Sequence, residues 1–310
     1  MSALAVPDFT LDPRALERRR LVQDTAARTL SRRHLTGRVM RLICLVALIA
    51  TLIPLGLMVG YTTYRGVGAL SWSFLTSLPA PAGIPGVTGG ISNALVGTLI
   101  IDGLALAMAI PVGLLVALFL VGRTGRLAAA LRFGADILTG LPTILIGLFV
   151  FAIVVEPLHH FAALWASMAL AVIMLPIMIR ANEEALRTVP EDLWEAGMAL
   201  GAQRSRVVRS VVVRTALPGL VTGNLLALSR AVGETAPLLF TISVFSYTMN
   251  FSPLSPMNSL PYTIYLDSQS AFRGLQSQAW GAAFVLVVLV LVLAVVGRVV
   301  AGRLTRRAQI

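Results

Sequence analysis

An arginine and a glutamate stand four positions apart inside a stretch that is otherwise apolar or small. Arg230 and Glu234 lie within Ser-Arg-Ala-Val-Gly-Glu-Thr-Ala-Pro, residues 229 to 237, and Thr235 follows the glutamate directly. Positions i and i+4 share one face of a helix, so the two side chains can pair if the helix is continuous. Charges inside an apolar span cost about 2.5 to 3.5 kcal/mol each on insertion scales, and they usually mark a substrate path.

The residue types of this pair suit the binding of an oxyanion. An arginine presents a planar fork of donors that fits an oxyanion, and it stays charged when it is dehydrated. A neighbouring carboxylate keeps the site from binding too tightly, and it could accept a hydrogen bond from a protonated oxyanion. Pro237 should break the helix near the pair and free backbone groups towards a cavity. A structural pair that holds neighbouring helices together is the alternative interpretation.

A second constellation lies in the polar segment 188–214, which has the pattern of a helix, a glycine hinge and a second helix. Pro190 suits the first turn, acidic residues follow it, and Gly201 suits the position just after the last turn. Another backbone could approach closely at the small residues Ala196, Gly197 and Gly201.

Six apolar runs have to position these residues. Hydrophobic residues make up 57% of the 310 positions, charged residues only 13%, and the mean hydropathy is +0.84. A soluble chain is nearer a quarter charged, and roughly 18 to 20 apolar residues suffice to cross a bilayer. We therefore predict an all-α integral membrane protein with about six spans, near 41–63, 92–121, 137–156, 161–180, 216–245 and 280–301.

The spans divide the chain into three parts. An arginine-rich tail precedes the first span, and we expect it to be part helix and part disordered. The predicted parts are a cytoplasmic tail at 1–40, a transmembrane domain at 41–303 that includes the loop 188–214, and a cytoplasmic tail at 304–310. Two longer loops, 65–90 and 246–278, are rich in turn-forming residues.

The basic residues predict the orientation of these spans. All 25 basic residues are arginine, and six spans place only Arg65 and Arg273 on one side, Arg230 within a span and the other 22 on the side of both termini. Cytoplasmic loops carry an excess of basic residues, so we predict that both termini are cytoplasmic. The net charge of +11 therefore reflects membrane topology, and we expect no nucleic-acid partner.

Several kinds of chemistry are excluded. The single cysteine, Cys44, allows no intrachain disulfide and no cysteine-based metal site. A Walker A loop needs a lysine, and the chain has none, so any ATP hydrolysis would need another polypeptide. We found no nucleophile–base constellation and no zinc-ligand spacing. We therefore predict no catalytic residues, no metal and no cofactor bound by this chain, which is not itself an enzyme.

Three other polar positions lie within or near the predicted spans. Asp102 lies about ten residues into the second span, where it could line a path or make a polar contact near the outer end. Arg180 and Glu184 are at i and i+4 near the cytoplasmic end of the fourth span, and we predict that they form a solvated pair.

The segment 188–214 resembles the cytoplasmic loop of ABC importer permeases, which has the pattern E-A-A-x-x-x-G. Glu195, Ala196, Gly197 and Gly201 occupy the matching positions, while Arg214 stands in place of a proline later in that pattern. In the family this loop is the coupling helix that sits in a groove of the ATPase subunit. The resemblance therefore implies the type I ABC importer permease fold, alternating access, and ATP on a partner subunit.

Residues 230–241, Arg-Ala-x-Gly-Glu-Thr-Ala-Pro-Leu-Leu-Phe-Thr, are similar to the signature of PstA-type permeases of bacterial high-affinity phosphate importers. Further matching blocks extend the likeness over roughly residues 60 to 300. The resemblance implies phosphate import across the bacterial inner membrane, with Arg230, Glu234 and Thr235 on the substrate pathway. It also implies contact with membrane lipid and four partner subunits: a PstC-like permease, two PstB-like ATPase subunits and a periplasmic PstS-like phosphate-binding protein.

Three alternative functions stay open at this point. One is a permease for another oxyanion, such as molybdate or sulfate. Another is a secondary phosphate transporter or channel that needs no ATPase, which should show an internal repeat. The third is a membrane scaffold or phosphate sensor that transports nothing.

Overall fold

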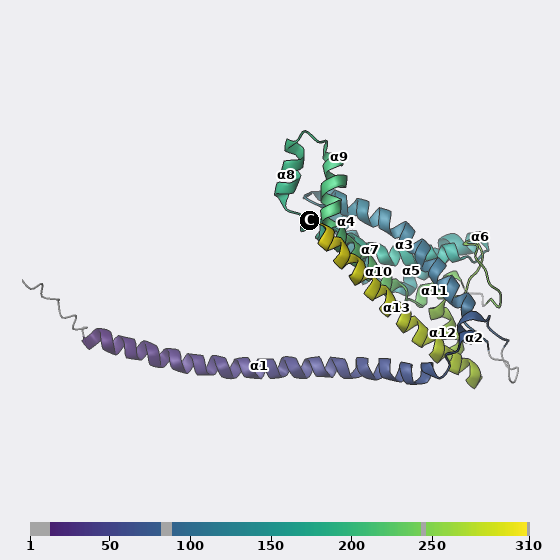
Figure 1. Cartoon of the computed structure of the whole chain (residues 1–310), viewed down its shortest axis with the longest axis horizontal. Helices are drawn as coiled ribbons and strands as arrows, with labels where there is room; N and C mark the ends of the chain where they lie inside the picture. Colours follow the sequence, from purple (N-terminus) through teal and green to yellow (C-terminus); the bar gives the residue numbers. More distant parts are fainter. Residues whose placement is uncertain (1–12, 82–88, 243–245, 309–310) are drawn as a thin grey trace, which may run out of the picture. The chain divides into compact units, whose positions relative to one another are not determined.

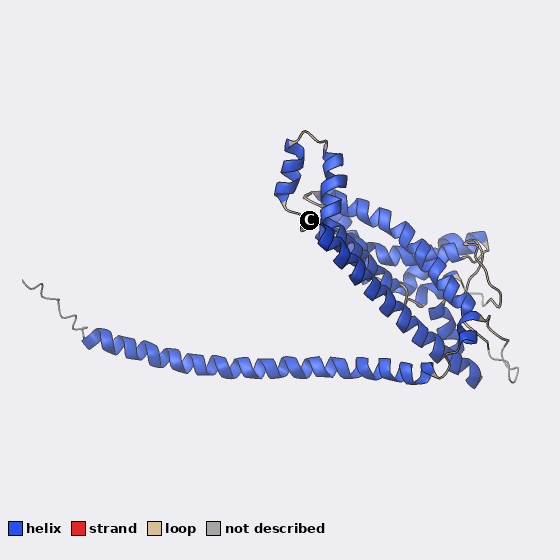
Figure 2. Ribbon diagram, viewed as in Figure 1, coloured by secondary structure: helices blue, strands red, loops and turns tan. Residues whose placement is uncertain are grey.

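The computed structural model describes residues 13–81, 89–242 and 246–308, and this described part of the chain is helical, with no strand (Figure 2). The chain divides into two compact units, Met1–Tyr61 and Thr62–Ile310. The predicted all-α class is therefore confirmed.

The helix α1, Pro13–Val67, contains 55 residues and supplies the whole described part of the first unit. Its apolar portion, Thr36–Val67, is long enough to cross a membrane. Residues 13–35 belong to the same helix and precede this portion. Pro54 lies inside α1, and the helix continues past it. The start of the predicted tail, residues 1–12, lies outside the described residues.

The second unit holds every other helix, in an order that follows the chain. Figure 1 shows most of these elements by label: α2 Trp72–Thr76, α3 Ser92–Leu120, α4 Arg126–Gly140, α5 Thr143–Val150, the π-helix η1 Phe151–Val155, α6 Glu156–Leu158, α7 Ala163–Arg187, α8 Glu191–Ala199, α9 Arg204–Val207, the π-helix η2 Val208–Val212, α10 Val213–Ala231, α11 Ala236–Thr241, α12 Leu260–Ser268 and α13 Arg273–Ala308.

The number of membrane spans agrees with the sequence. Five helical stretches of the described chain are long and apolar enough to cross: Thr36–Val67, Ser92–Leu120, Ala163–Arg187, Arg204–Ala231 and Arg273–Leu304. A sixth candidate consists of Arg126–Gly140 and Thr143–Leu158, which are bent by 102° with respect to each other. The bend falls inside the predicted third span, 137–156: α4 ends at Gly140, and α5 begins at Thr143 after Leu141 and Pro142.

The core of the second unit forms around α7. This helix packs against α3, α4, α5, α10 and α11, and its residues Ala163, Ala166 and Met174 are fully buried. Small residues let the neighbouring backbones approach closely, as membrane helices commonly do. A Cβ atom on Gly223 of α10 would lie only 2.6 Å from the Cβ of Ala181 on α7, so this crossing requires a glycine.

The loops of the second unit gather at its two ends. Figure 1 shows α8 and α9 at one end and α2, α6 and α12 at the other. By the arginine distribution, α8 and α9 lie on the predicted cytoplasmic side and α12 lies on the opposite side.

Candidate functional site

The charged pair lies where the fifth span breaks. The helix α10 ends at Ala231, and the N–H of Glu234 donates to the carbonyl oxygen of Ala231 at 3.0 Å in a turn. The helix α11 then begins at Ala236, with Thr235 as its N-cap residue. The predicted break near Pro237 is confirmed, and the chain leaves helical geometry between the two charges.

The two charged side chains still face each other across this turn. Arg230 Nε and Glu234 Oε1 are 3.9 Å apart, with side chains 59% and 18% exposed. Because more than half of the Arg230 side chain is exposed, its guanidinium donors can be reached from the surface of the second unit. An anion could bind to these donors while Glu234 stays beside it.

The turn is held in place by α5. A Cβ atom on Gly147 would lie 2.5 Å from the Cα of Pro237, so the two backbones touch at a position that only glycine permits. Two phenylalanine rings strengthen the same region, since Phe151 and Phe240 have centroids 6.4 Å apart in an edge-to-face arrangement. The bent α4–α5 pair thus fixes the turn that carries Glu234 and Thr235.

The loop between the fourth and fifth spans forms the predicted helix, hinge and helix. Gly201 has a φ of +78°, the left-handed conformation that favours glycine, and it separates α8 from α9. Glu195 and Ala196 are exposed on α8, and the nearby Leu200 is 89% exposed.

Gly197 packs against α9, whereas Ala196 beside it is exposed. A Cβ atom there would lie 2.9 Å from Cγ1 of Val207, which is itself buried at the end of α9. The absence of a side chain at Gly197 thus lets α8 fold against α9. An approach by another protein at this residue stays a prediction.

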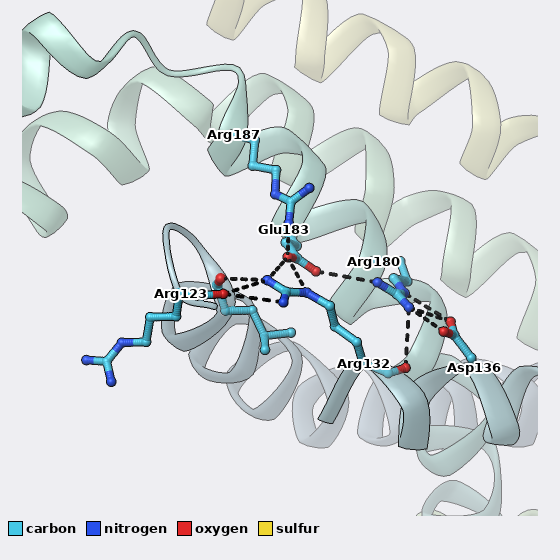
Figure 3. A network of polar contacts seen from close by, with 7 residues as sticks. Arg123, Arg132, Asp136, Arg180, Glu183 and Arg187 are labelled. Atoms are coloured by element: carbon cyan, nitrogen blue, oxygen red, sulfur yellow. Dashed lines mark hydrogen bonds and ion pairs between the residues drawn. The ribbon is translucent and has the colours of Figure 1, made fainter. Parts of the chain in front are cut away.

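A buried glutamate forms a charged network that the sequence did not predict (Figure 3). The Glu183 side chain on α7 is 4% exposed, and its Oε1 accepts from Arg132 Nη2 at 2.7 Å and from Arg187 Nη2 at 2.6 Å. Its Oε2 is 3.7 Å from Nη1 of Arg180. Three arginines therefore compensate one desolvated carboxylate, as a buried charge requires.

Arg132 and Arg180 extend this network to neighbouring helices. Arg132 Nη2 also donates to the carbonyl oxygens of Leu120 at 2.9 Å and Arg123 at 3.3 Å, and so ties the segment at the end of α3 to α4. Arg180 donates to both carboxylate oxygens of Asp136 on α4. The network thus joins the end of α3, the middle of α4 and the last turns of α7 in one place.

The predicted pair of Arg180 with Glu184 is wrong. Glu184 is exposed, and Arg180 reaches Asp136 and Glu183 instead. Helical spacing alone could not predict that Arg180 binds Asp136, because that carboxylate is 44 residues away in the sequence. The signal that could have identified Glu183 is its position among the apolar residues of the α7 face.

Asp102 is buried on α3, at 7% exposure, within the second span as the sequence indicated. In the three described ranges, no three His, Cys, Asp or Glu side chains lie together in a way that could hold a metal ion. The chemistry available at the pair and in the network is therefore electrostatic: binding of an anion, and ion pairing between helices.

The comparisons with known proteins agree with these features. Residues 109–310 match the family described as "Binding-protein-dependent transport system inner membrane component". The chain is 35% identical to the phosphate transport system permease protein PstA of Yersinia pestis over 241 residues, which cover 77% of this chain and 81% of the relative. It is 37% identical to phosphate transport system permease protein PstA 1 of Mycobacterium tuberculosis H37Rv, over 72% of this chain and 73% of the relative.

A solved structure shares the fold. The inward-facing MetNI methionine ABC transporter matches with a TM-score of 0.51 and 22% identity, over 71% of this chain and 94% of the solved chain. Together with the membrane-spanning helices, these matches place the protein in the bacterial inner membrane as a multi-pass permease component. The chain belongs to the family of binding-protein-dependent transport system inner membrane components, within its PstA permeases.

Proposed function

We propose that this chain is the transmembrane permease subunit of an ATP-driven, high-affinity importer of inorganic phosphate. The observation that carries the proposal is its 35% identity to the Yersinia pestis phosphate permease over 77% of this chain. The arginine–glutamate pair supports it, because a guanidinium with exposed donors beside a carboxylate suits a protonated oxyanion.

The partners follow from the same family. Because the chain has no lysine for a Walker A loop, ATP binds to two separate PstB-like subunits. A PstC-like permease completes the pathway, and a periplasmic PstS-like protein delivers phosphate. The exposed face of α8 around Glu195 and Ala196 docks on an ATPase subunit, with Gly197 and Gly201 setting the shape of the loop.

In this proposal Arg230, Glu234 and Thr235 line the pathway at the break between α10 and α11. The guanidinium binds the anion by charge-assisted hydrogen bonds, and the carboxylate accepts the proton that hydrogen phosphate offers and fully ionised sulfate lacks. Replacing Glu234 by Gln should therefore weaken phosphate uptake and admit sulfate. Unaltered phosphate uptake with sulfate still excluded would contradict this role for Glu234.

The function is tested by uptake of radiolabelled phosphate at low micromolar concentration, in cells that lack their own permease. The cells carry this chain with its operon partners, with and without the ATPase subunit. Uptake that requires the ATPase and is not displaced by sulfate or molybdate supports the proposal.

The other outcomes separate the alternatives. Displacement of phosphate by molybdate or sulfate would indicate a permease for another oxyanion, and uptake without the ATPase would indicate a secondary carrier. Absence of uptake under every condition would contradict the transport function.

A further inference from the structure

A pocket of about 270 Å³ lies at the end of the Thr62–Ile310 unit that is opposite to α8 and α9. It is formed by α12, the first turns of α13, the segment between α2 and α3, and Tyr247 in the segment before α12. Hydrogen bonds fix these walls: Gln278 Nε2 donates to the carbonyl oxygen of Gly89 at 3.1 Å, and the N–H of Leu260 donates to Thr98 Oγ1 at 2.8 Å. The pocket is therefore preformed.

Two buried polar side chains of α12 line this pocket. Thr263 and Asp267 are one helical turn apart, and they are 4% and 6% exposed. Thr263 Oγ1 has no hydrogen-bond partner, and within the described ranges no ion pair or hydrogen bond reaches the Asp267 carboxylate. Buried polar groups are almost always hydrogen-bonded, so a donor from another molecule that enters the pocket would satisfy the Asp267 carboxylate. The Thr263 hydroxyl is itself closed off from solvent and contributes only to the polar surroundings of that carboxylate.

The electrostatics of the pocket favour a cationic donor. Burial raises the pKa of the Asp267 carboxyl from 3.8 to about 6, because removal from water disfavours its charged form. A cation placed next to the carboxylate would offset this cost. An anion would be repelled, so the pocket is distinct in chemistry from the phosphate pathway at Arg230.

The size and lining of the pocket favour one long side chain as that cation. Its volume lies just below the roughly 300–1,000 Å³ of small-molecule sites. Pro79, Leu266 and Leu275 offer apolar walls for an aliphatic stem, while Asp267 offers a carboxylate to its charged end. A bare divalent ion would find only one carboxylate here.

We propose that this pocket receives one arginine or lysine side chain of the periplasmic substrate-binding protein and so anchors that protein on the permease. The proposal rests on the proposed function, since it requires delivery by a binding protein. It places the contact at Asp267, on the side of the membrane opposite to the ATPase subunits.

The test uses the complete transporter, reconstituted with its ATPase and second permease subunits. ATP hydrolysis is measured against increasing concentrations of the purified, phosphate-loaded binding protein. In the Asp267→Asn variant, the half-saturating concentration should rise by about thirtyfold or more, as expected when one partner of a buried charge pair is removed. The rate at saturating binding protein should fall by much less, because the contact holds the partner and does not touch the transported anion.

A matched control removes a different carboxylate on the same side of the membrane. Glu156 is exposed at the start of α6, outside the pocket, and Glu156→Gln should leave the half-saturating concentration at the wild-type value. The two variants change the net charge equally, so a difference between them reports the pocket itself. An equal half-saturating concentration for Asp267→Asn and Glu156→Gln would overturn the proposal.

A second variant covers the case in which Asp267→Asn fails to assemble. Leu275→Trp fills the pocket from α13 while it retains the carboxylate, and it should raise the half-saturating concentration similarly. If a chelator removes the difference in half-saturating concentration between the wild type and Asp267→Asn, the pocket binds a metal ion and the proposal is overturned.

The failure of the proposed function is distinguishable from these outcomes. If the binding protein does not stimulate the wild-type transporter, both proposals fail. If it stimulates the wild type and every pocket variant at the same concentration, only the anchoring role fails.

Discussion

Arg230 presents its guanidinium to the surface of the second unit, while the Glu234 carboxylate beside it is largely buried. Replacing Arg230 by Lys keeps the charge but removes the planar fork of donors. We expect phosphate uptake to fall by about tenfold or more, which corresponds to roughly 1.4 kcal/mol of lost stabilisation. Initial uptake rates at equal membrane expression measure the effect, and Arg303→Lys in the exposed end of α13 serves as the control. An uptake rate for Arg230→Lys equal to that of the wild type would contradict a binding role for the guanidinium donors of Arg230.

At the scale of elements, α8 is the exposed helix that should transmit the action of the ATPase. A tryptophan at Ala196 would add bulk on one face of α8, whereas a tryptophan at Met198 points to a different face, about 200° around the helix. We expect Ala196→Trp to uncouple the transporter, so that ATP is hydrolysed with little phosphate imported, while Met198→Trp retains coupling. The ratio of phosphate imported to ATP hydrolysed measures this, and an unchanged ratio for Ala196→Trp would contradict docking through that face.

The charged network joins three elements and should contribute to their stability. Glu183→Gln removes the charge that compensates Arg132, Arg180 and Arg187, so the free energy of unfolding should fall by about 1–3 kcal/mol. The partial exposure of the arginines keeps this below the cost of breaking a fully buried pair. Thermal unfolding of the purified complex in detergent measures the loss. Glu184→Gln, one residue away and exposed, should unfold like the wild type; equal loss in both variants would contradict the role of the network.

Local patterns predicted the features that depend on neighbouring residues. The hinge at Gly201 follows from the need for a left-handed residue after α8, and the break near Pro237 follows from the missing N–H of proline. The bend between α4 and α5 and the contact of Glu183 with Arg132 depend on packing between residues far apart in the chain. Arg132 is 51 residues from Glu183, and no periodicity encodes such a contact. The sequence therefore predicted both candidate sites but not the network that joins the helices around them.

At the scale of the whole molecule, orientation follows from the asymmetry of the arginines. Of 25 arginines, only Arg65 and Arg273 fall on the predicted outer side. The single native cysteine, Cys44, makes this testable, because Cys44→Ser leaves a chain without thiols. Leu158, at the end of α6, and Leu200, after α8, are both exposed, and each can be replaced by cysteine in that background.

A membrane-impermeant maleimide should label Leu158→Cys in intact cells and Leu200→Cys only after the membrane is opened. This outcome requires an odd number of crossings between the two positions, and α7 alone supplies that crossing. It would place α8 with the cytoplasmic ATPase subunits and α12 with the periplasmic binding protein, as both proposals require. Labelling of Leu200→Cys in intact cells would reverse the orientation, and the arginine-rich side would then face outward against the usual distribution of basic residues.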